Sequence, residues 1–236
     1  KWSAAGLVQV RRLAPAKADG VKMLPHRDGN DISDSAHNGP AVTVVIPTFN
    51  RWPLICESIE NALAQESSDS DRELILVDDG SSDDTESELP THYGDRVRYI
   101  RQENQGPSVA RNAGIDAANG QHVAFLDSDD LWLPGKLSAQ MRALEASPQS
   151  AFSYHPCIMI KADGTPTKQL HMATDRGVTG DSFEVMLRHQ PLQTSAVIVR
   201  RDVIEDLGGF DTDLFSGQDT DLWLRMTSEY EGVSIE

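Results

Sequence analysis

The sequence has few cysteines and no long apolar run, and both shortages restrict what the chain can be. Its two cysteines, Cys56 and Cys157, form neither a CxxC pair nor a zinc-ligand spacing. No uncharged apolar stretch approaches the ~20 residues that cross a bilayer, so we expect no transmembrane segment. No secretory signal is visible. A reduced, cytoplasmic setting is therefore the expectation, with a single disulfide left open.

Positive charge is also scarce. The chain has 21 Lys and Arg against 37 Asp and Glu, a formal net charge of -16. Such an acidic surface is a poor partner for nucleic acid or anionic lipid. Residues 1–40 differ, because basic residues outnumber acidic ones there and the segment ends in turn formers. We expect 1–40 to be an N-terminal extension and linker. Because the chain starts at Lys1 and not Met, a piece of a longer protein, trimmed at the C-terminus too, is compatible with the sequence.

Three common ligand motifs are missing. The sequence has no GxxxxGK[ST], so a P-loop NTPase is unsupported. It has no GxGxxG after a predicted strand, so a Rossmann dinucleotide site is unsupported. The pattern Asp127-x-Asp129 fails as an EF-hand, because Leu131 and Trp132 follow where an oxygen ligand and a glycine are required.

What the sequence does contain from Ala41 onward is an alternation of apolar strands and helices. Strands are predicted at 41–47, 73–77, 96–100 and 122–127, and helices near 54–63 and 107–120. This order predicts an α/β fold with a mainly parallel sheet. Asn50 is expected to cap the first helix. The second half is predicted to be mixed, with helices at 136–146, 181–189 and 219–230, a hairpin from 151 with its turn at 162–164, and a strand at 195–201.

Polar residues follow the predicted strands at the points where each strand ends. In open α/β sheets this edge binds ligands. The residues concerned are Thr48 and Asn50, then Asp78 and Asp79, then Asp127, Ser128, Asp129 and Asp130. So many carboxylates at one edge should repel one another unless a cation is bound. Mg²⁺ and Mn²⁺ use one or two protein carboxylates and complete their coordination with water and substrate phosphate, so the predicted ligand carries a diphosphate.

Five motifs then occur in a familiar order: VTVVIPTFNR, LILVDDGSSDDT, NQGPSVARNAGI, VAFLDSDDLWLPGKL, and GGFD with SGQDTDLWLR. From about Ala41 to its end, the sequence resembles the family 2 glycosyltransferases. The resemblance implies a GT-A fold over 41–236, in which 41–133 binds the nucleotide sugar and 134–236 binds the acceptor. It also implies Mn²⁺ or Mg²⁺, a nucleotide-diphosphate sugar donor, most often a UDP-sugar, and a saccharide or other hydroxyl acceptor.

The resemblance further implies a role for each matching residue. Pro47, Thr48 and Asn50 would line the nucleotide pocket, and Asp79, with Asp78, would hydrogen-bond the base. Arg111 would lie near the base or the diphosphate. Asp127-Ser128-Asp129 would be the DxD motif, with Asp127 near the ribose and metal and Asp129 as the direct metal ligand. Asp219 would be the catalytic base of a single displacement with inversion. The family often has Tyr where Phe49 stands and Glu where Gln218 stands.

Several structural and functional alternatives stay open at this point. Asp78 and Asp79 could simply form a turn, Arg111 could pair with a surface carboxylate, and Asp219 could belong to a solvated acidic face with Asp211, Asp213 and Asp221. VAFLDSDD also fits a haloacid-dehalogenase-like phosphatase, with Asp127 as nucleophile and Asp129 as acid. A third alternative is a non-catalytic module that binds a nucleotide sugar without transferring it.

Overall fold

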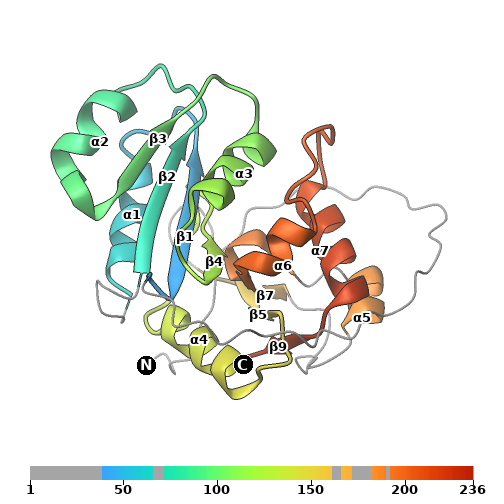
Figure 1. Ribbon diagram of the computed structural model, residues 1–236. Helices are drawn as coiled ribbons and strands as arrows, with labels where there is room; N and C mark the ends of the chain where they lie inside the picture. Colours follow the sequence, from blue (N-terminus) through green and yellow to red (C-terminus); the bar gives the residue numbers. More distant parts are fainter. Residues whose placement is uncertain (1–38, 66–71, 161–165, 172–181, 190–191, 236) are drawn as a thin grey trace.

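The computed structural model describes residues 39–65, 72–160, 166–171, 182–189 and 192–235 (Figure 1). The extension predicted over 1–40 therefore lies almost wholly outside the described residues, as does the hairpin turn predicted at 162–164. The helices and strands run in the order β1 (Val42–Thr48), α1 (Ile55–Leu63), β2 (Arg72–Asp78), α2 (Thr85–Tyr93), η2 (Gly94–Arg96), β3 (Arg98–Arg101), α3 (Pro107–Ala117), β4 (His122–Phe125), α4 (Lys136–Ala146), β5 (Phe152–Tyr154), β6 (Cys157–Ile160), β7 (Pro166–His171), α5 (Phe183–His189), η3 (Thr194–Ala196), β8 (Ile198–Arg200), α6 (Arg201–Asp206), α7 (Gln218–Glu229) and β9 (Gly232–Ser234).

A seven-stranded sheet in the order β3-β2-β1-β4-β8-β5-β9 forms the centre of the fold. Strands β1 to β4 are parallel, while β8 runs antiparallel to both of its neighbours. The second half of the chain thus extends the sheet that the first half begins, and the two halves share one sheet. The fold predicted from the sequence, a mainly parallel α/β sheet with a mixed second half, is confirmed.

Apolar residues of β1 point to both faces, so both faces of the sheet are buried. On one face, Val44 and Ile46 pack with α1, α2 and α4. On the other, Val45 packs with residues of α3, α6 and α7. Gly114 of α3 lies so close to β1 that an added Cβ would come within 2.3 Å of the Val45 Cγ1 atom. This close approach holds α3 tightly against β1.

Two local predictions need correction. The hairpin predicted from residue 151 begins later, because Phe152–Tyr154 is a strand of the main sheet and β6 pairs with β7 instead. Asn50 does not cap α1: that helix begins at Ile55, with Leu54 at its N-cap and no side-chain cap. Helices α2 and α6 were not predicted, since neither has a clear apolar repeat. Within the described residues, none of the helices has the length and apolar character to cross a membrane.

Candidate active site

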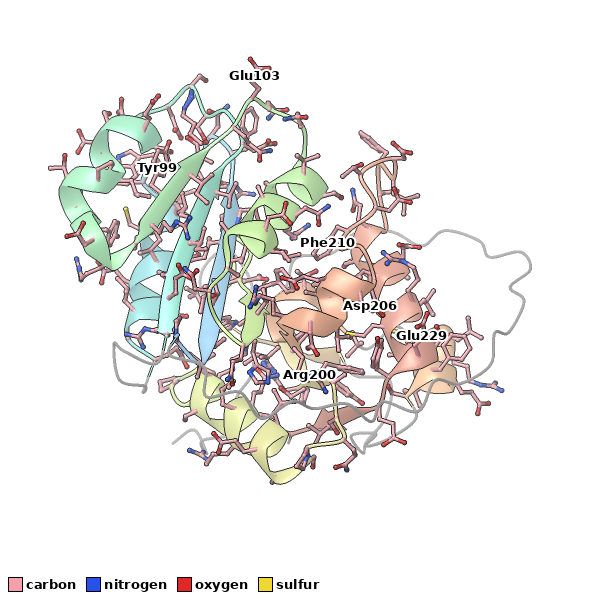
Figure 2. The ribbon with its side chains drawn as sticks, viewed as in Figure 1. Tyr99, Glu103, Arg200, Asp206, Phe210 and Glu229 are labelled. Carbon is pink, nitrogen blue, oxygen red and sulfur yellow. The ribbon has the colours of Figure 1, made fainter. Side chains whose placement is uncertain are left out.

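The loops that follow β1, β2, β3 and β4 meet at one edge of the sheet, and the loop preceding α7 reaches the same end of the molecule (Figure 1). In Figure 2, Glu103 in the loop after β3 marks this edge. A backbone hydrogen bond from the Asp79 N–H to the Thr48 carbonyl (2.9 Å) joins the first two loops. The topology therefore brings together the polar strand ends that the sequence predicts as a site.

The loop after β1 is held in place by the loop after β2. Asn50 adopts a left-handed backbone conformation with a φ of 51°, which asparagine tolerates better than most residues. Its N–H donates to the Ser81 hydroxyl (2.9 Å), and its Oδ1 accepts from the Ser82 N–H (2.7 Å). Pro47 and Thr48 are buried in the last part of β1, and the Thr48 hydroxyl has no hydrogen-bond partner. The hydroxyl is also shielded from solvent, so its contact with a ligand stays a prediction.

Asp78 is fully buried and makes hydrogen bonds only within the protein. Its Oδ1 accepts from the Ser81 N–H (2.8 Å), and its Oδ2 accepts from the Tyr99 hydroxyl (2.6 Å). Burial, together with this carboxylate, raises the pKa of Tyr99 well above its usual value. These contacts favour the interpretation of Asp78 as a residue that fixes the turn after β2.

The Asp79 carboxylate is surrounded by the loop after β3. Its Oδ1 accepts from the Gln102 side-chain amide (2.7 Å) and from the Gln105 N–H (2.9 Å), and its Oδ2 accepts from the Gly106 N–H (2.8 Å). The residue is only 4% exposed. Asp79 therefore fixes the loop that leads into α3, and its direct contact with a base stays a prediction.

Because three N–H groups converge on it, Asp79→Asn is expected to destabilise the fold by about 3 kcal/mol. An asparagine presents one acceptor oxygen and turns an NH₂ group toward donors. Urea unfolding would measure the change. Asp84→Asn, an exposed residue of the following turn whose side chain makes no capping bond, is the matched control and should change stability by less than about 0.5 kcal/mol. A loss under about 1 kcal/mol for Asp79→Asn would contradict this role.

Asp127 follows β4 and forms an ion pair with Arg111 of α3. The Arg111 Nη2 lies 2.6 Å from the Asp127 Oδ1, and the guanidinium also lies over the Phe210 ring, 5.3 Å from its centroid. The Arg111 side chain is 11% exposed and Asp127 is 30% exposed. Arg111 thus pairs with a half-buried strand-end carboxylate and not with one on the open surface, and its predicted place near the base or the diphosphate stays a prediction.

Asp129 pairs with an arginine that sequence reasoning did not single out. The Arg51 Nη2 lies 3.2 Å from the Asp129 Oδ2, with the two side chains 36% and 30% exposed. Arg51 stands in the quoted segment VTVVIPTFNR, but nothing in that pattern indicates a partner 78 residues away. Ser128, between the two aspartates, is half-buried.

Ser195 is a second residue that sequence reasoning missed, and it supports the turn from the inside. Its hydroxyl accepts from the Asp127 N–H (2.9 Å) and donates to the Asp130 Oδ2 (2.6 Å), while its carbonyl accepts from the Trp132 indole (2.7 Å). Burial, together with the charge of Asp127, raises the pKa of Asp130 to about 8. Asp130 is therefore mostly protonated at neutral pH and adds little negative charge to the edge.

These contacts correct one step of the sequence argument. The carboxylates at this edge are balanced by arginines, hydroxyls and backbone N–H groups, so repulsion among them does not by itself require a metal ion. Asp78 and Asp79 are satisfied within the protein, and Asp130 is mostly neutral. Of the carboxylates at this edge, Asp127 and Asp129 are the two that are left as candidate cation ligands.

The two remaining carboxylates fit a hard divalent cation. Each uses one oxygen in its ion pair, and toward the described residues the other oxygen is free. The described part of the chain contains no cluster of three or more His, Cys, Asp or Glu that could hold a metal. Mg²⁺ and Mn²⁺ need no such cluster, because water and substrate phosphate supply their other ligands. Asp127 and Asp129 are therefore suitable donors for either ion.

The structure separates Asp219 from the other aspartates near it. Asp221 pairs with Arg225 (2.8 Å), and Asp211 is exposed and accepts from the Asp213 N–H (2.8 Å). Asp219, in the first turn of α7, is half-buried and forms no ion pair with the described residues; its Oδ1 accepts from the Thr220 N–H (2.7 Å). Asp219 is therefore better suited to accept a proton than Asp221, which is paired with Arg225, or Asp211, which is exposed.

Gln218, which replaces the usual glutamate, shapes the loop before α7. Its Nε2 donates to the carbonyls of Leu214 and Phe215 (3.0 Å each). A glutamate side chain has no N–H and could not make these bonds. Phe215, held at the tip of this loop, is fully exposed.

The segment between α6 and α7 is fastened to the first half of the chain. The Asn112 amide both donates to the Phe210 carbonyl (2.8 Å) and accepts from the Phe210 N–H (2.9 Å). Arg225 donates to the carbonyls of Leu207 and Gly209. Figure 2 shows Phe210 where α3 faces the α6 and α7 region. Asn112 thus links α3 to the chain that leads into α7.

Along the described residues, an open hollow of about 510 Å³ lies at this edge, lined by Gly80 and residues 101–104. A cavity of about 670 Å³ lies elsewhere, at the amino ends of β2 and β3, where Arg72, Glu73 and Arg98 line it. That cavity is remote from the DxD turn and contains none of the predicted site residues. The strand-end residues, and not this cavity, form the candidate site.

Known proteins with similar sequences are glycosyltransferases. The chain is 31% identical over 202 residues to an uncharacterised glycosyltransferase of Rickettsia felis, covering 85% of this chain but 32% of the relative. It is 36% identical over 147 residues to the GalNAc(5)-diNAcBac-PP-undecaprenol beta-1,3-glucosyltransferase of Campylobacter jejuni, covering 61% of this chain and 45% of the relative. The chain thus spans about a third to a half of the length of these relatives.

Solved structures show the same fold. TarS 1-349 of S. aureus in complex with UDP aligns with a TM-score of 0.65 at 20% identity, covering 83% of this chain and 60% of that one. The mannosyltransferase PcManGT of Pyrobaculum calidifontis, in complex with GDP-Man and Mn²⁺, aligns with a TM-score of 0.62 at 23% identity, covering 87% and 58%. The fold is therefore that of the GT-A glycosyltransferases.

Glycosyl transferase family 2 matches this sequence over residues 43–208, more than half of the chain. The matched range includes the strand ends from Thr48 to Asp129 and stops at Gly208, before α7. The order of motifs, the sheet and the family match agree, and we conclude that the chain belongs to glycosyl transferase family 2.

Proposed function

We propose that this chain transfers a sugar from a nucleotide-diphosphate sugar to an acceptor hydroxyl, with inversion at the anomeric carbon and with the help of a divalent cation. The observation that carries the proposal is the turn after β4, where Asp127 and Asp129 each keep one free oxygen at the edge that binds ligands in this kind of sheet. Solved neighbours that bind UDP, UDP-GlcNAc or GDP-Man support a nucleotide-sugar donor.

In this proposal Asp127 and Asp129 hold Mn²⁺ or Mg²⁺. The cation would neutralise charge on the donor diphosphate and on the departing nucleoside diphosphate. Ser195 keeps the backbone of the DxD turn in place, because its hydroxyl accepts from the Asp127 N–H. The Mn²⁺ bound to the neighbour PcManGT supports a divalent ion.

The first half of the chain, 41–133, would bind the donor. The unpartnered Thr48 hydroxyl, with Pro47, Asn50 and Ser128, would line the nucleotide site. Asp78 and Asp79 would shape that site through the turn and loop they hold, and Asp79 would contact the base if the loop after β3 opens toward it. We propose a UDP-sugar as donor, with residues from 134 onward contributing the acceptor side.

The chemical step follows from Asp219. Its carboxylate would take the proton from the acceptor hydroxyl as that oxygen attacks the anomeric carbon. The bond from that carbon to the phosphate oxygen breaks on the opposite face, and the nucleoside diphosphate leaves with the electron pair. Arg111, beside Asp127, would favour the charge that grows on the leaving group. No covalent intermediate with the protein is needed.

Thermal unfolding with UDP tests donor binding. In the presence of Mn²⁺, UDP at about 100 times its Kd should stabilise the chain by about 2.7 kcal/mol. For a chain of this size that corresponds to a rise in Tm of about 5–10 °C. The rise should shrink when EDTA removes the ion. GDP, the nucleotide of the mannosyltransferase donor, is the comparison that tests the base.

The results with UDP and GDP distinguish a sugar transferase from a module that only binds the nucleotide sugar. No stabilisation by either nucleotide, with or without Mn²⁺, would contradict the proposal. Stabilisation without release of UDP from any UDP-sugar, even into water, would favour the non-catalytic binding module. Membership of glycosyl transferase family 2 over residues 43–208 argues against the phosphatase alternative.

A further inference from the structure

Arg51 and Asp129 come from two neighbouring strands of the sheet. Arg51 lies three residues beyond β1 and Asp129 lies four residues beyond β4, and these strands are adjacent and parallel. The Arg51 Nη2 reaches the Asp129 Oδ2 at 3.2 Å. The proposed metal ligand is therefore paired with a protein cation.

The backbone around Arg51 is fixed, but its guanidinium is not. The preceding Asn50 N–H donates to Ser81, the following Trp52 N–H donates to Asp83 (2.8 Å), and the Arg51 carbonyl accepts from the Ile55 N–H (3.0 Å). Toward the described residues, Asp129 is the one partner of the guanidinium, whose side chain is 36% exposed. The side chain can leave Asp129 without disturbing the loop.

Arg111 provides the contrast within the same site. Its guanidinium is 11% exposed, lies 2.6 Å from Asp127 and stacks on the Phe210 ring. Its place is therefore set by packing as well as by charge. Of the two arginines beside the DxD turn, Arg51 is the one with freedom to change partners.

A divalent ion on the free oxygen of Asp129 would compete with Arg51 for the same carboxylate, because two cations on one carboxylate repel each other. Oxygen ligands of Mg²⁺ lie about 2 Å from the ion. Phosphate oxygens on that ion would thus lie about 3 Å from the Asp129 oxygen. Arg51, 3.2 Å from the other oxygen of the same carboxylate, lies beside that position, and guanidinium groups bind phosphate well.

We propose that Arg51 exchanges partners during binding: it pairs with Asp129 in the free site and with the donor diphosphate once the cation and donor are bound. This inference rests on the proposed function. It implies that Arg51 weakens cation binding when no nucleotide is present and strengthens nucleotide binding when the cation is present. Cation and donor would then bind with positive coupling, part of which comes from this one side chain.

The test measures two dissociation constants in the full 236-residue chain, for Mn²⁺ alone by electron paramagnetic resonance and for UDP at saturating Mn²⁺ by calorimetry. Arg51→Ala should tighten Mn²⁺ binding by about threefold, the value of one partly exposed ion pair. It should weaken UDP binding by about tenfold, the value of one charge-assisted hydrogen bond. Arg51→Gln, which keeps most of the side chain's bulk, should change both dissociation constants in the same directions as Arg51→Ala.

Arg188→Ala is the matched control, because it removes the same charge from an exposed ion pair on α5. It should leave both constants within about twofold. Opposite changes in the two constants, seen with both Arg51 variants and absent in the control, support the exchange. Changes in the same direction, or an unchanged Mn²⁺ constant, overturn it. If the unaltered chain binds neither Mn²⁺ nor UDP, the proposed function itself fails. That result differs from failure of the exchange alone, in which the unaltered chain still binds both.

Discussion

Asp219→Asn is expected to lower the rate of sugar transfer by about 10² to 10⁴, the usual contribution of a general base. The asparagine keeps the size of the side chain and its position in the first turn of α7, but it cannot accept the proton of the acceptor hydroxyl. Binding of UDP with Mn²⁺ should change by less than about twofold, because Asp219 makes no ion pair at the DxD turn. The measurement is release of UDP from a donor that the unaltered chain consumes.

Asp221→Asn is the control for this result. Asp221 stands two residues away on the same helix and is already paired with Arg225. Its substitution removes the same charge, but the side chain is engaged with Arg225, which in turn donates to the carbonyls of Leu207 and Gly209. A rate within about fivefold of the unaltered chain is expected for it. Equal losses from the two substitutions, or a rate for Asp219→Asn above a tenth of normal, would remove Asp219 from the role of base.

The second large effect is expected from Asp129→Ala. Loss of a direct ligand should weaken Mn²⁺ binding by at least about 100-fold, since removal of outer hydrogen-bond partners of metal sites already costs 10- to 100-fold. The rise in Tm that UDP produces with Mn²⁺ should then fall to the value measured in EDTA. Asp213→Ala removes a carboxylate from an exposed loop and should leave that rise intact. An unchanged Mn²⁺-dependent rise in Asp129→Ala would contradict the metal assignment.

The strands of the sheet could be predicted from the sequence because each strand is marked by its own run of apolar residues. Val42–Thr48 is almost wholly apolar and Arg72–Asp78 contains the apolar run Leu74–Val77, and a strand buried on both faces requires such a run. The polar strand ends were placed together for the same reason, since parallel strands end at one edge. Helices such as Lys136–Ala146 were found from their apolar spacing. The less amphipathic helix Thr85–Tyr93, with Pro90 inside it, gave no such signal.

What the sequence could not supply were partners distant along the chain. Nothing in TFNR indicates that Arg51 meets Asp129, and nothing around Ser195 indicates that its hydroxyl lies between Asp127 and Asp130. Charge balance at the edge depends on those pairs, so the argument from repulsion overestimated the need for a cation. The hydrogen bonds of Asp79 could not be predicted for a similar reason, because its N–H donors come from residues 102–106.

The two hydrogen bonds between Asn112 and the Phe210 backbone have a consequence for how such proteins diversify. They anchor the chain just before the loop 211–217, while the Gln218 amide holds the far end of that loop. Insertions or replacements between these two anchors would leave the helix carrying Asp219 in register with α3. New acceptor preferences could therefore evolve in this loop, around the exposed Phe215, without rebuilding the reaction centre.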